Sequence, residues 1–391
     1  MRFLSAILFA AVLTLAGGPA YGQTVDSVSP APNAIGVAPY ATIEVTFAGL
    51  SGVTASDFSA ADLYVFGAQT GRCQVDGASL AYDQSTSTLS FQTVCAFKTG
   101  ELVSVTVPAN ALAALTQPFT WQFTVEARYG TGEFQQVAGS PVMGAARDAA
   151  KSVDFPVSLF AGEINGDLLP DLVHLNRASG ELTVRINEGD GSFTAQPQAV
   201  GRATNVVGGD LDGSIGGAGR GELDLVLNDA LGNTLEILQN NGSGGLTATA
   251  TIQTGARPTA VDIADFNRDG ALDIAVAAFG EDRVFVHLND GSGGFPNAQR
   301  SAYAVGAAPS DLLARDVDND GDLDLVVASL GAEQIDYLEN DGTGGFSGGG
   351  ALALPFPPGA LAARDVLGNA GNAYGDGWVD LVVAEQEGNT V

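Results

Sequence analysis

The feature that most constrains the fold of this chain is an acidic motif that occurs five times after about residue 128. One aspartate marks each copy, and the intervals between successive markers are 53, 49, 51 and 56 residues. A glycine-rich turn ending in Phe or Leu follows each of the first four copies at the same period. Self-similarity at this period predicts supersecondary units that stack on one another. The marker aspartates are Asp171, Asp224, Asp273, Asp324 and Asp380.

Each copy also contains short apolar segments that have the character of β-strands. In the fourth copy the acidic loop runs directly into residues 325–328, an apolar run rich in β-branched residues, which predicts a buried strand. Residues 172–175 and 274–278 are the corresponding runs in the first and third copies, and 182–186 and 284–288 predict a second strand after them. Units of about fifty residues with four short strands are typical of propeller blades.

The acidic loop of the fourth copy has the composition of a site for a hard cation. Asp316, Asp318 and Asp320 supply carboxylates at positions 1, 3 and 5, and Asp324 supplies another at position 9. Gly321 allows a sharp turn at position 6. This all-oxygen set suits calcium, but an EF-hand would need a bidentate Glu at position 12 and a following helix, and position 12 here is a valine. We therefore predict a calcium-binding loop inside a β-hairpin.

The first residues have the pattern of an export signal. Arg2 precedes an apolar stretch over residues 3–15, and the small residues Ala20 and Gly22 follow it. This pattern predicts a signal peptide over residues 1–22, cleaved after Gly22, and an exported mature chain with no membrane span. The chain carries 16 basic and 45 acidic residues, for a net charge of −29, which argues against nucleic acid and anionic membranes as partners.

Residues 23–127 show the period-two alternation of a β-sandwich, for example at Ile43, Val45 and Phe47. The only two cysteines, Cys73 and Cys95, are each in phase with apolar neighbours, and in an exported chain they are expected to form a disulfide. The opening SVSPAPNAIGV and the closing TWQFTV resemble bacterial Ig-like domains of the S-layer type. That resemblance implies a spacer or an adhesive stalk module.

The repeats over residues 128–391 resemble the FG-GAP or VCBS family, whose best-known member is the propeller of integrin alpha subunits. The resemblance implies a β-propeller with Ca²⁺ held in hairpin loops, so the predicted fold class is all-β, an Ig-like β-sandwich followed by an incomplete β-propeller of four-stranded blades. The third and fourth copies match the motif fully. The first has Leu168 where Gly is expected, the second has residues 213–220 inserted, and in the fifth Leu367 replaces a ligand.

Metal is expected first in the third and fourth loops, next in the first, and least in the second and fifth. The implied ligands beyond those of the fourth loop are Asp265, Asn267, Asp269 and Asp273 in the third loop, Glu163, Asn165, Asp167 and Asp171 in the first, Asp210, Asp212 and Asp224 in the second, and Asp365, Asp376 and Asp380 in the fifth.

Two alternatives accompany this interpretation. Asp and Gly also dominate ordinary tight turns, so a single copy of the motif would carry little weight, and bound calcium would more readily rigidify a blade than take part in chemistry. Family propellers usually have seven blades, so five loops and an ending inside a strand favour a fragment. A competing hypothesis is that residues 123–134 complete the last blade and close a five-bladed ring.

No catalytic constellation is evident in the sequence. There is no HExxH motif and no nucleophile elbow, and His174 and His287 lie on predicted strands of separate repeats. We therefore expect a non-enzymatic, exported, calcium-stabilised adhesion or binding protein whose partner is an extracellular protein or glycan. The alternatives are a non-catalytic part of a secreted hydrolase or polysaccharide lyase, and a purely structural surface protein.

Overall fold

The computed structural model describes residues 25–48, 53–98, 101–108, 118–126, 156–213, 222–364 and 379–386. Within these ranges the chain consists of β-strands and short 3₁₀ helices without an α-helix, which confirms the all-β class. No helix of the described part is long and apolar enough to cross a membrane. The predicted signal peptide over 1–22 and the predicted domain boundary at 127/128 lie outside the described residues.

The Ig-like domain is a sandwich of two antiparallel four-stranded sheets, with strand orders β1-β2-β6-β5 and β4-β3-β7-β8. Two 3₁₀ helices, η1 and η2, lie between β2 and β3. The elements of this domain are β1 (Val25–Ser29), β2 (Ile43–Phe47), η1 (Ala55–Asp57), η2 (Ala60–Asp62), β3 (Tyr64–Gly67), β4 (Gly71–Cys73), β5 (Ala81–Asp83), β6 (Thr88–Phe91), β7 (Leu102–Val107) and β8 (Phe119–Thr124).

The core of the sandwich follows from the alternation seen in the sequence. In β2 the apolar side chains point inward and Glu44 points to solvent, as a half-buried strand requires. Trp121 is fully buried at the centre and donates its indole N–H to the carbonyl of Pro30 at 3.0 Å. Cys73 and Cys95 both lie in this core and form the predicted disulfide, with Cα atoms 6.0 Å apart.

The repeats form four four-stranded antiparallel sheets and, in the described residues, a fifth sheet of two strands. We number these sheets blade 1 to blade 5. Short 3₁₀ helices η3 (Asn297–Gln299) and η4 (Leu330–Ala332) occur within blades 3 and 4. The strands are β9 (Pro156–Gly162), β10 (Asp171–Asn176), β11 (Glu181–Asn187) and β12 (Phe193–Ala199) in blade 1; β13 (Asn205–Gly209), β14 (Asp224–Asp229), β15 (Thr234–Asn240) and β16 (Leu246–Gln253) in blade 2; β17 (Pro258–Ala264), β18 (Asp273–Ala278), β19 (Arg283–His287) and β20 (Arg300–Ala304) in blade 3; β21 (Pro309–Arg315), β22 (Asp324–Ser329), β23 (Gln334–Asn340) and β24 (Phe346–Ala353) in blade 4; and β25 (Pro358–Arg364) and β26 (Asp380–Glu385) in blade 5.

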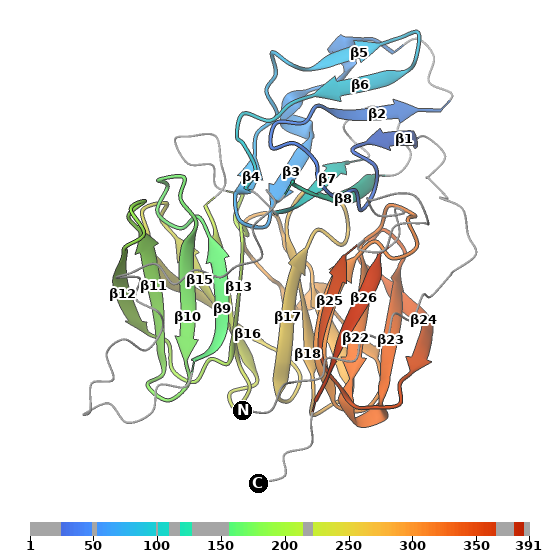
Figure 1. The fold of residues 1–391 in the computed structure, drawn as a ribbon. Coiled ribbons are helices and arrows are strands. Elements are labelled where there is room, and N and C mark those ends of the chain that lie inside the picture. Colours follow the sequence, from blue (N-terminus) through green and yellow to red (C-terminus); the bar gives the residue numbers. More distant parts are fainter. Residues whose placement is uncertain are drawn as a thin grey trace.

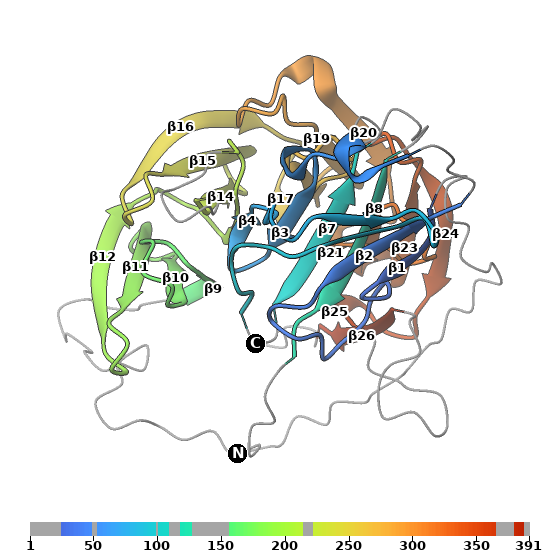
Figure 2. The ribbon, with the colours of Figure 1, turned by 90° about the horizontal axis from the view of Figure 1, so that it is seen from above.

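The blades are arranged around an axis with their first strands innermost (Figure 2). Each first strand lies against the first strand of the next blade, from β9 to β25. The second strands carry the apolar runs of the repeat, and every residue of β18 and β22 is buried. Apolar clusters fill the space between neighbouring blades, as in the cluster that joins Phe266 of blade 3 to Leu325 of blade 4. Burial of both faces therefore explains why these runs are continuous and do not alternate.

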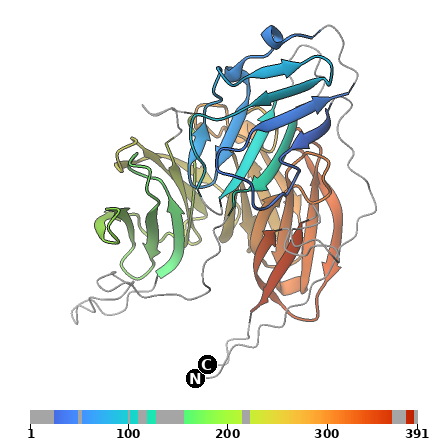
Figure 3. The same cartoon turned by 45° about the horizontal axis from the view of Figure 1, so that its top comes forward.

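The Ig-like domain sits on the end of the propeller where the innermost strands finish (Figures 1 and 3). Its sheet β4-β3-β7-β8 is the one nearer the blades, as the bond from the Thr120 amide of β8 to the Gly321 carbonyl at 3.0 Å shows. Phe123 pairs with Val103 of β7 and belongs to this sandwich. The hypothesis that residues 123–134 close a ring therefore has its first residues in the Ig-like sheet, and residues 127–134 lie outside the described part.

Candidate metal sites

Each acidic loop stands in the chain between the first and the second strand of its blade, and the described residues of loops 1 to 4 lie at the end that faces the Ig-like domain. We name them loop 1 (residues 163–171), loop 2 (210–224), loop 3 (265–273), loop 4 (316–324) and loop 5 (365–380). In every blade the aspartate of position 9 is the first residue of the second strand. In loop 5 Asp380 is described, whereas the predicted ligands Asp365 and Asp376 lie outside the described residues.

The position-9 aspartates have a structural role that the motif alone did not indicate. In loop 3, Asp273 Oδ2 accepts the Phe266 amide at 3.0 Å and Oδ1 accepts the Asn289 amide at 2.8 Å. In loops 1 to 4 the position-9 carboxylate thus ties its own loop to the end of the third strand of its blade, and it is fully buried or nearly so. The same pair of bonds is made by Asp171 to Ile164 and Asn187, by Asp224 to Leu211 and Asn240, and by Asp324 to Val317 and Asn340.

An asparagine follows the position-9 aspartate of loops 1 to 4 by sixteen residues, and sequence reasoning missed it; in loops 2, 3 and 4 this asparagine is buried. The Asn340 side-chain amide donates to the carbonyl of Phe266 in the preceding blade at 2.9 Å and to Leu323 in its own blade at 3.0 Å. Asn289 and Asn240 make the equivalent bonds between blades 3 and 2 and between blades 2 and 1. These asparagines therefore connect neighbouring blades, and their constant spacing is the signal that could have identified them.

Loops 4 and 2 each bring three carboxylates together. Oxygen atoms of Asp316, Asp318 and Asp324 all lie within 4.8 Å of one another, and so do those of the loop 2 triad Asp210, Asp212 and Asp224. Asp316 Oδ1 and Asp210 Oδ2 are buried, and neither has a hydrogen-bond partner in the described part of the chain. Buried carboxylate oxygens without donors are costly, and a divalent cation would satisfy them. The residues present therefore fit calcium.

The carboxylates of loop 2 converge although the sequence ranked this loop among the least expected metal sites. The insertion in this loop was expected to disrupt the site. Its two ends are held, however, by the ladder in which Gly209 pairs with Asp224, so Asp210 and Asp224 remain neighbours whatever the length between them. The pairing of β13 with β14 therefore keeps the loop 2 carboxylates together, although the spacing in the sequence suggested that they were apart.

Burial and mutual repulsion raise the pKa of these carboxyl groups. The pKa of Asp316 is raised well above its usual range by burial and then by the carboxylates of Asp324, Asp320 and Asp318. In loop 2, burial and the nearby carboxylates of Asp224 and Asp212 raise the pKa of Asp210 to about 8. Negative charge is thus unfavourable in both clusters without a counter-charge, which a proton or a cation can supply.

Loop 3 holds its acids by internal hydrogen bonds. Asp265 Oδ2 accepts the Gly270 amide at 3.0 Å, and its Oδ1 accepts the Asp269 amide at 3.1 Å. The Asn267 side chain donates to Asp269 Oδ2 at 2.8 Å. Among the described residues, three carboxylates do not converge here as they do in loop 4. The predicted ligands of loop 3 therefore share one loop, and metal binding there stays a prediction.

Loop 1 contains a backbone conformation that its sequence makes costly. Glu163 Oε1 accepts the amides of Gly166 and Asp167, and the Asn165 side chain donates to Asp167, so the predicted ligands lie together in one turn. Position 6 is Leu168, and its φ is +79°, close to the +87° and +90° of the glycines in loops 3 and 4. A side chain in this left-handed region costs about 1–2 kcal/mol. The predicted strain is therefore present.

We expect Leu168→Gly to stabilise the protein. The leucine side chain is half exposed, so its removal loses little packing, and relief of the left-handed strain should raise the free energy of unfolding by about 1 kcal/mol, or Tm by about 2–4 °C. Thermal unfolding followed by circular dichroism measures the change. Leu231→Gly is the matched control, because Leu231 is also exposed but has no positive φ, and it should not raise Tm. A lower Tm for Leu168→Gly would contradict the strain argument.

The Ig-like domain bonds directly to the acidic loops. Asn33 donates to Asn319 Oδ1 of loop 4 at 3.0 Å, and the Thr120 amide donates to the carbonyl of Gly321. The ring of Phe119 lies against Gly321 so closely that a Cβ there would clash with it. Glycine is thus required at position 6 of loop 4 by the domain contact as well as by its φ.

Contacts of the same kind reach the other loops. Thr106 of β7 donates to Asp265 Oδ2 of loop 3 at 3.2 Å, and the Glu163 amide of loop 1 donates to the carbonyl of Gln69 at 3.0 Å. The Tyr64 ring lies against Gly270 of loop 3. One sheet of the Ig-like domain therefore rests on loops from blades 1, 3 and 4, so the order of these loops affects the contact between the domains.

Together these elements define an all-β protein in which an Ig-like sandwich covers the loop end of propeller blades. Comparison with known families agrees: residues 22–125 match the bacterial Ig-like domain, and residues 219–276 and 265–327 match the FG-GAP-like repeat. The chain therefore carries a bacterial Ig-like domain followed by FG-GAP-like repeats. Domains of these families are typically non-catalytic, and their combination suggests an extracellular or surface binding module.

Three similar solved structures are distant in sequence. A functionally unknown protein from Desulfotomaculum acetoxidans is 11% identical, with 83% of each chain covered and a TM-score of 0.40. A protein from Lactobacillus plantarum is 15% identical over 77% of this chain and 70% of its own, with a TM-score of 0.38. A putative 6-phosphogluconolactonase from Bacteroides uniformis is 13% identical over 80% and 82%, with a TM-score of 0.37. These TM-scores are low, so the similarities carry no inference about function. The comparison with curated proteins gave no match.

Proposed function

We propose that this chain is an exported calcium-binding module that attaches to an extracellular protein or glycan. Calcium in the acidic loops has a structural role in this proposal. The matched families favour a binding module, and the net charge of −29 disfavours nucleic acid and anionic membranes as partners. The signal pattern of residues 1–22 supports export, and extracellular fluids contain enough calcium to fill sites of modest affinity.

One observation carries the calcium proposal, namely the geometry of loop 4. Three carboxylates converge there, and the buried oxygen Asp316 Oδ1 has no donor among the described residues. Asp316, Asp318 and Asp324 would hold the ion, which would supply positive charge and no redox or acid–base chemistry. Loop 2 offers a second triad of the same kind.

The position of these loops suggests what the ion would accomplish. Asn33 and Thr120 of the Ig-like domain bond to groups of loop 4, so an ordered loop 4 presents a fixed platform to that domain. A metal-free loop 4 would be pushed open by repulsion among its carboxylates. Calcium would therefore fix the orientation of the Ig-like domain and leave the outer strands of the blades available to a partner.

A calcium titration of the metal-free mature chain, residues 23–391, tests the proposal. Isothermal titration calorimetry should show saturable binding, and the double variant Asp316→Asn, Asp318→Asn should lose the heat that belongs to loop 4. The matched control is Glu44→Gln with Glu188→Gln, which removes the same two charges from exposed positions and should bind as the wild type does. Wild-type and Asp316→Asn, Asp318→Asn proteins with identical isotherms would refute a site in loop 4.

A further inference from the structure

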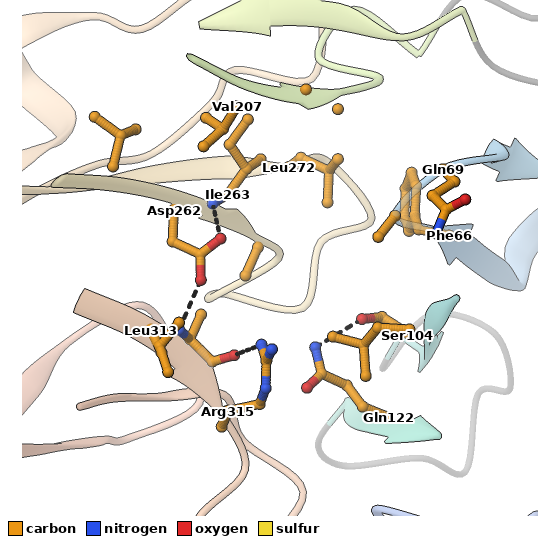
Figure 4. Close-up of a pocket in the computed structure, with 18 of the residues that line it drawn as sticks. Phe66, Gln69, Ser104, Gln122, Val207, Asp262, Ile263, Leu272, Leu313 and Arg315 are labelled. Carbon is orange, nitrogen blue, oxygen red and sulfur yellow. Dashed lines mark hydrogen bonds between the residues drawn. The ribbon is translucent and has the colours of Figure 1, made fainter. Parts of the chain in front are cut away.

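A cavity of about 490 Å³ lies on the propeller axis beneath the Ig-like domain (Figure 4). Its walls come from the innermost strands of the blades, and its roof comes from the Ig-like sheet β4-β3-β7-β8 through residues such as Phe66, Ser104 and Gln122. This volume is in the usual range for sites that bind small molecules. Asp210 of the loop 2 triad also lines the cavity, whereas no member of the loop 4 triad does.

Three acidic side chains line the cavity: Asp210 belongs to loop 2, and the other two are held by backbone amides of the innermost strands. Asp262 accepts the amide of Ile263 and, from the next blade, the amide of Ala314, both at 2.9 Å. Asp311 repeats the arrangement one blade further on, with Leu312 at 3.0 Å and Leu361 at 2.7 Å. Each of these two carboxylates thus connects its innermost strand to the next one.

Arg315 brings positive charge into the same space. It is the last residue of β21, it donates to the carbonyl of Ala314 at 2.6 Å, and its guanidinium lies in the cavity between the propeller and the Ig-like domain (Figure 4). Arg364 ends β25 at the equivalent position, whereas β9 and β17 end in a glycine and an alanine. Asp262 lies near enough to offset part of the charge of Arg315, and the neighbouring Arg364 adds to it. The Arg315 guanidinium favours an anion on this side of the axis, and a carboxylate matches its planar donor fork.

Gln122 of β8 has a side-chain oxygen in the cavity wall that could accept a hydrogen bond from a ligand. Its side chain is 4% exposed and lies beside Arg315 in Figure 4. Its Nε2 donates to Ser104 Oγ at 2.9 Å, but its buried Oε1 has no hydrogen-bond partner in the described part of the chain. An orphaned acceptor of this kind is costly, and a ligand hydroxyl would satisfy it.

The opposite wall of the cavity is apolar. Val207, Ile263 and Leu272 of the propeller line it, and Phe66 of the Ig-like domain lies beside them (Figure 4). A ligand that fits both walls has a carboxylate at one end, hydroxyl donors, and a compact ring with an apolar face. Sugar acids combine these three properties.

We propose that this cavity binds a uronic acid, with the sugar carboxylate paired to Arg315 and a sugar hydroxyl donating to Gln122 Oε1. The site is built by both domains, because the cation comes from β21 and the acceptor comes from β8. The Ig-like domain is then part of a binding site as well as a spacer. A sugar acid is one form of the glycan partner proposed above, but this site is argued from the cavity residues alone, so it can fail while that proposal stands.

Binding of monosaccharides to the calcium-loaded mature chain tests this site. Titrations with glucuronate, galacturonate and mannuronate, followed by calorimetry or saturation-transfer NMR, should give saturable binding for at least one of them. Glucose, which lacks the carboxylate, should bind at least about tenfold more weakly, since a charge-assisted hydrogen bond to arginine is lost. No saturable binding of any of the three acids, or equal binding of glucose, would overturn the proposal. Sulfate binding as tightly as the best acid would also overturn it, in favour of an unspecific anion site.

Variants locate the binding in the cavity. Arg315→Gln should weaken the best acid about tenfold or more, and Arg283→Gln, which makes the same change at an exposed position, should leave the affinity unchanged. Gln122→Glu keeps the size of the side chain and places a carboxylate beside the ligand, so it should abolish binding even if Arg315→Gln fails to fold. Thermal unfolding verifies that each variant is folded. Unchanged affinity in a folded Gln122→Glu protein contradicts the assignment.

Discussion

Removal of calcium is expected to lower the Tm of the mature chain by about 10–20 °C at about pH 8. A ligand that binds only the folded state, at a free concentration of a hundred times its Kd, contributes about 2.7 kcal/mol to the free energy of unfolding. Two such sites shift the Tm of a protein of this size by about 10–20 °C. The two sites are the carboxylate triads of loops 4 and 2. Differential scanning calorimetry before and after passage over a chelating resin measures the loss.

At about pH 5, removal of calcium should lower the Tm very little. The raised pKa values of the loop carboxyl groups are the reason. Burial and adjacent carboxylates raise the pKa of Asp210 to about 8, and burial and Asp269 raise that of Asp265 to about 7. At these groups the folded metal-free chain holds protons that the unfolded chain has released, so their contribution to stability is fully present below about pH 4 and is lost as the pH rises to about 7 to 8. Calcium supplies the missing positive charge at high pH, where the protons have left.

Two comparisons separate this linkage from a general effect of ionic strength. Magnesium at the same concentration screens charges equally but prefers a smaller octahedral site, so it should restore much less of the Tm. The Asp316→Asn, Asp318→Asn protein should lose about half of the calcium increment, and Glu44→Gln with Glu188→Gln should lose none. A calcium increment of the same size at both pH values would show that the raised pKa values do not describe the metal-free loops.

The sequence indicated the repeated architecture because the physics of a blade is local. The period places an acidic loop before each buried run, and burial on both faces makes that run uniformly apolar, as in β18 and β22. The disulfide between Cys73 and Cys95 was predictable for the same reason, since both residues alternate in step with the apolar residues that form the core. These features depend on residues close together in the chain or on one alternation pattern.

The candidate sites were harder to predict from the sequence because they depend on contacts between distant segments. Position 9 was interpreted as a ligand, yet Asp273 gives both carboxylate oxygens to backbone amides seven and sixteen residues away. Loop 2 was ranked low because its insertion lengthens the linear spacing, although the pairing of Gly209 with Asp224 keeps its ends together. The placement of the Ig-like domain on the loops rests on single bonds such as that from Thr106 to Asp265, which leave no periodic trace in either segment.

Replacement of the blade-connecting asparagine in blade 4 is expected to be among the most damaging single changes in the propeller. Asn340→Ala would leave the buried carbonyls of Phe266 and Leu323 without donors. Each unsatisfied group costs about 1–3 kcal/mol, so the free energy of unfolding should fall by about 2–5 kcal/mol. Urea unfolding of the calcium-loaded chain, followed by tryptophan fluorescence and circular dichroism, gives this difference.

The chain contains its own graded controls for that experiment. In blade 1, Asn187 donates to the carbonyl of Pro170 within its own blade at 3.1 Å, and no bond from it to another blade occurs among the described residues. Asn187→Ala should therefore cost about 1 kcal/mol, and Asn289→Ala should resemble Asn340→Ala because it also loses two buried partners. If all three variants lost the same free energy, the asparagines would be local turn residues, and the cohesion between blades would rest on the apolar clusters alone.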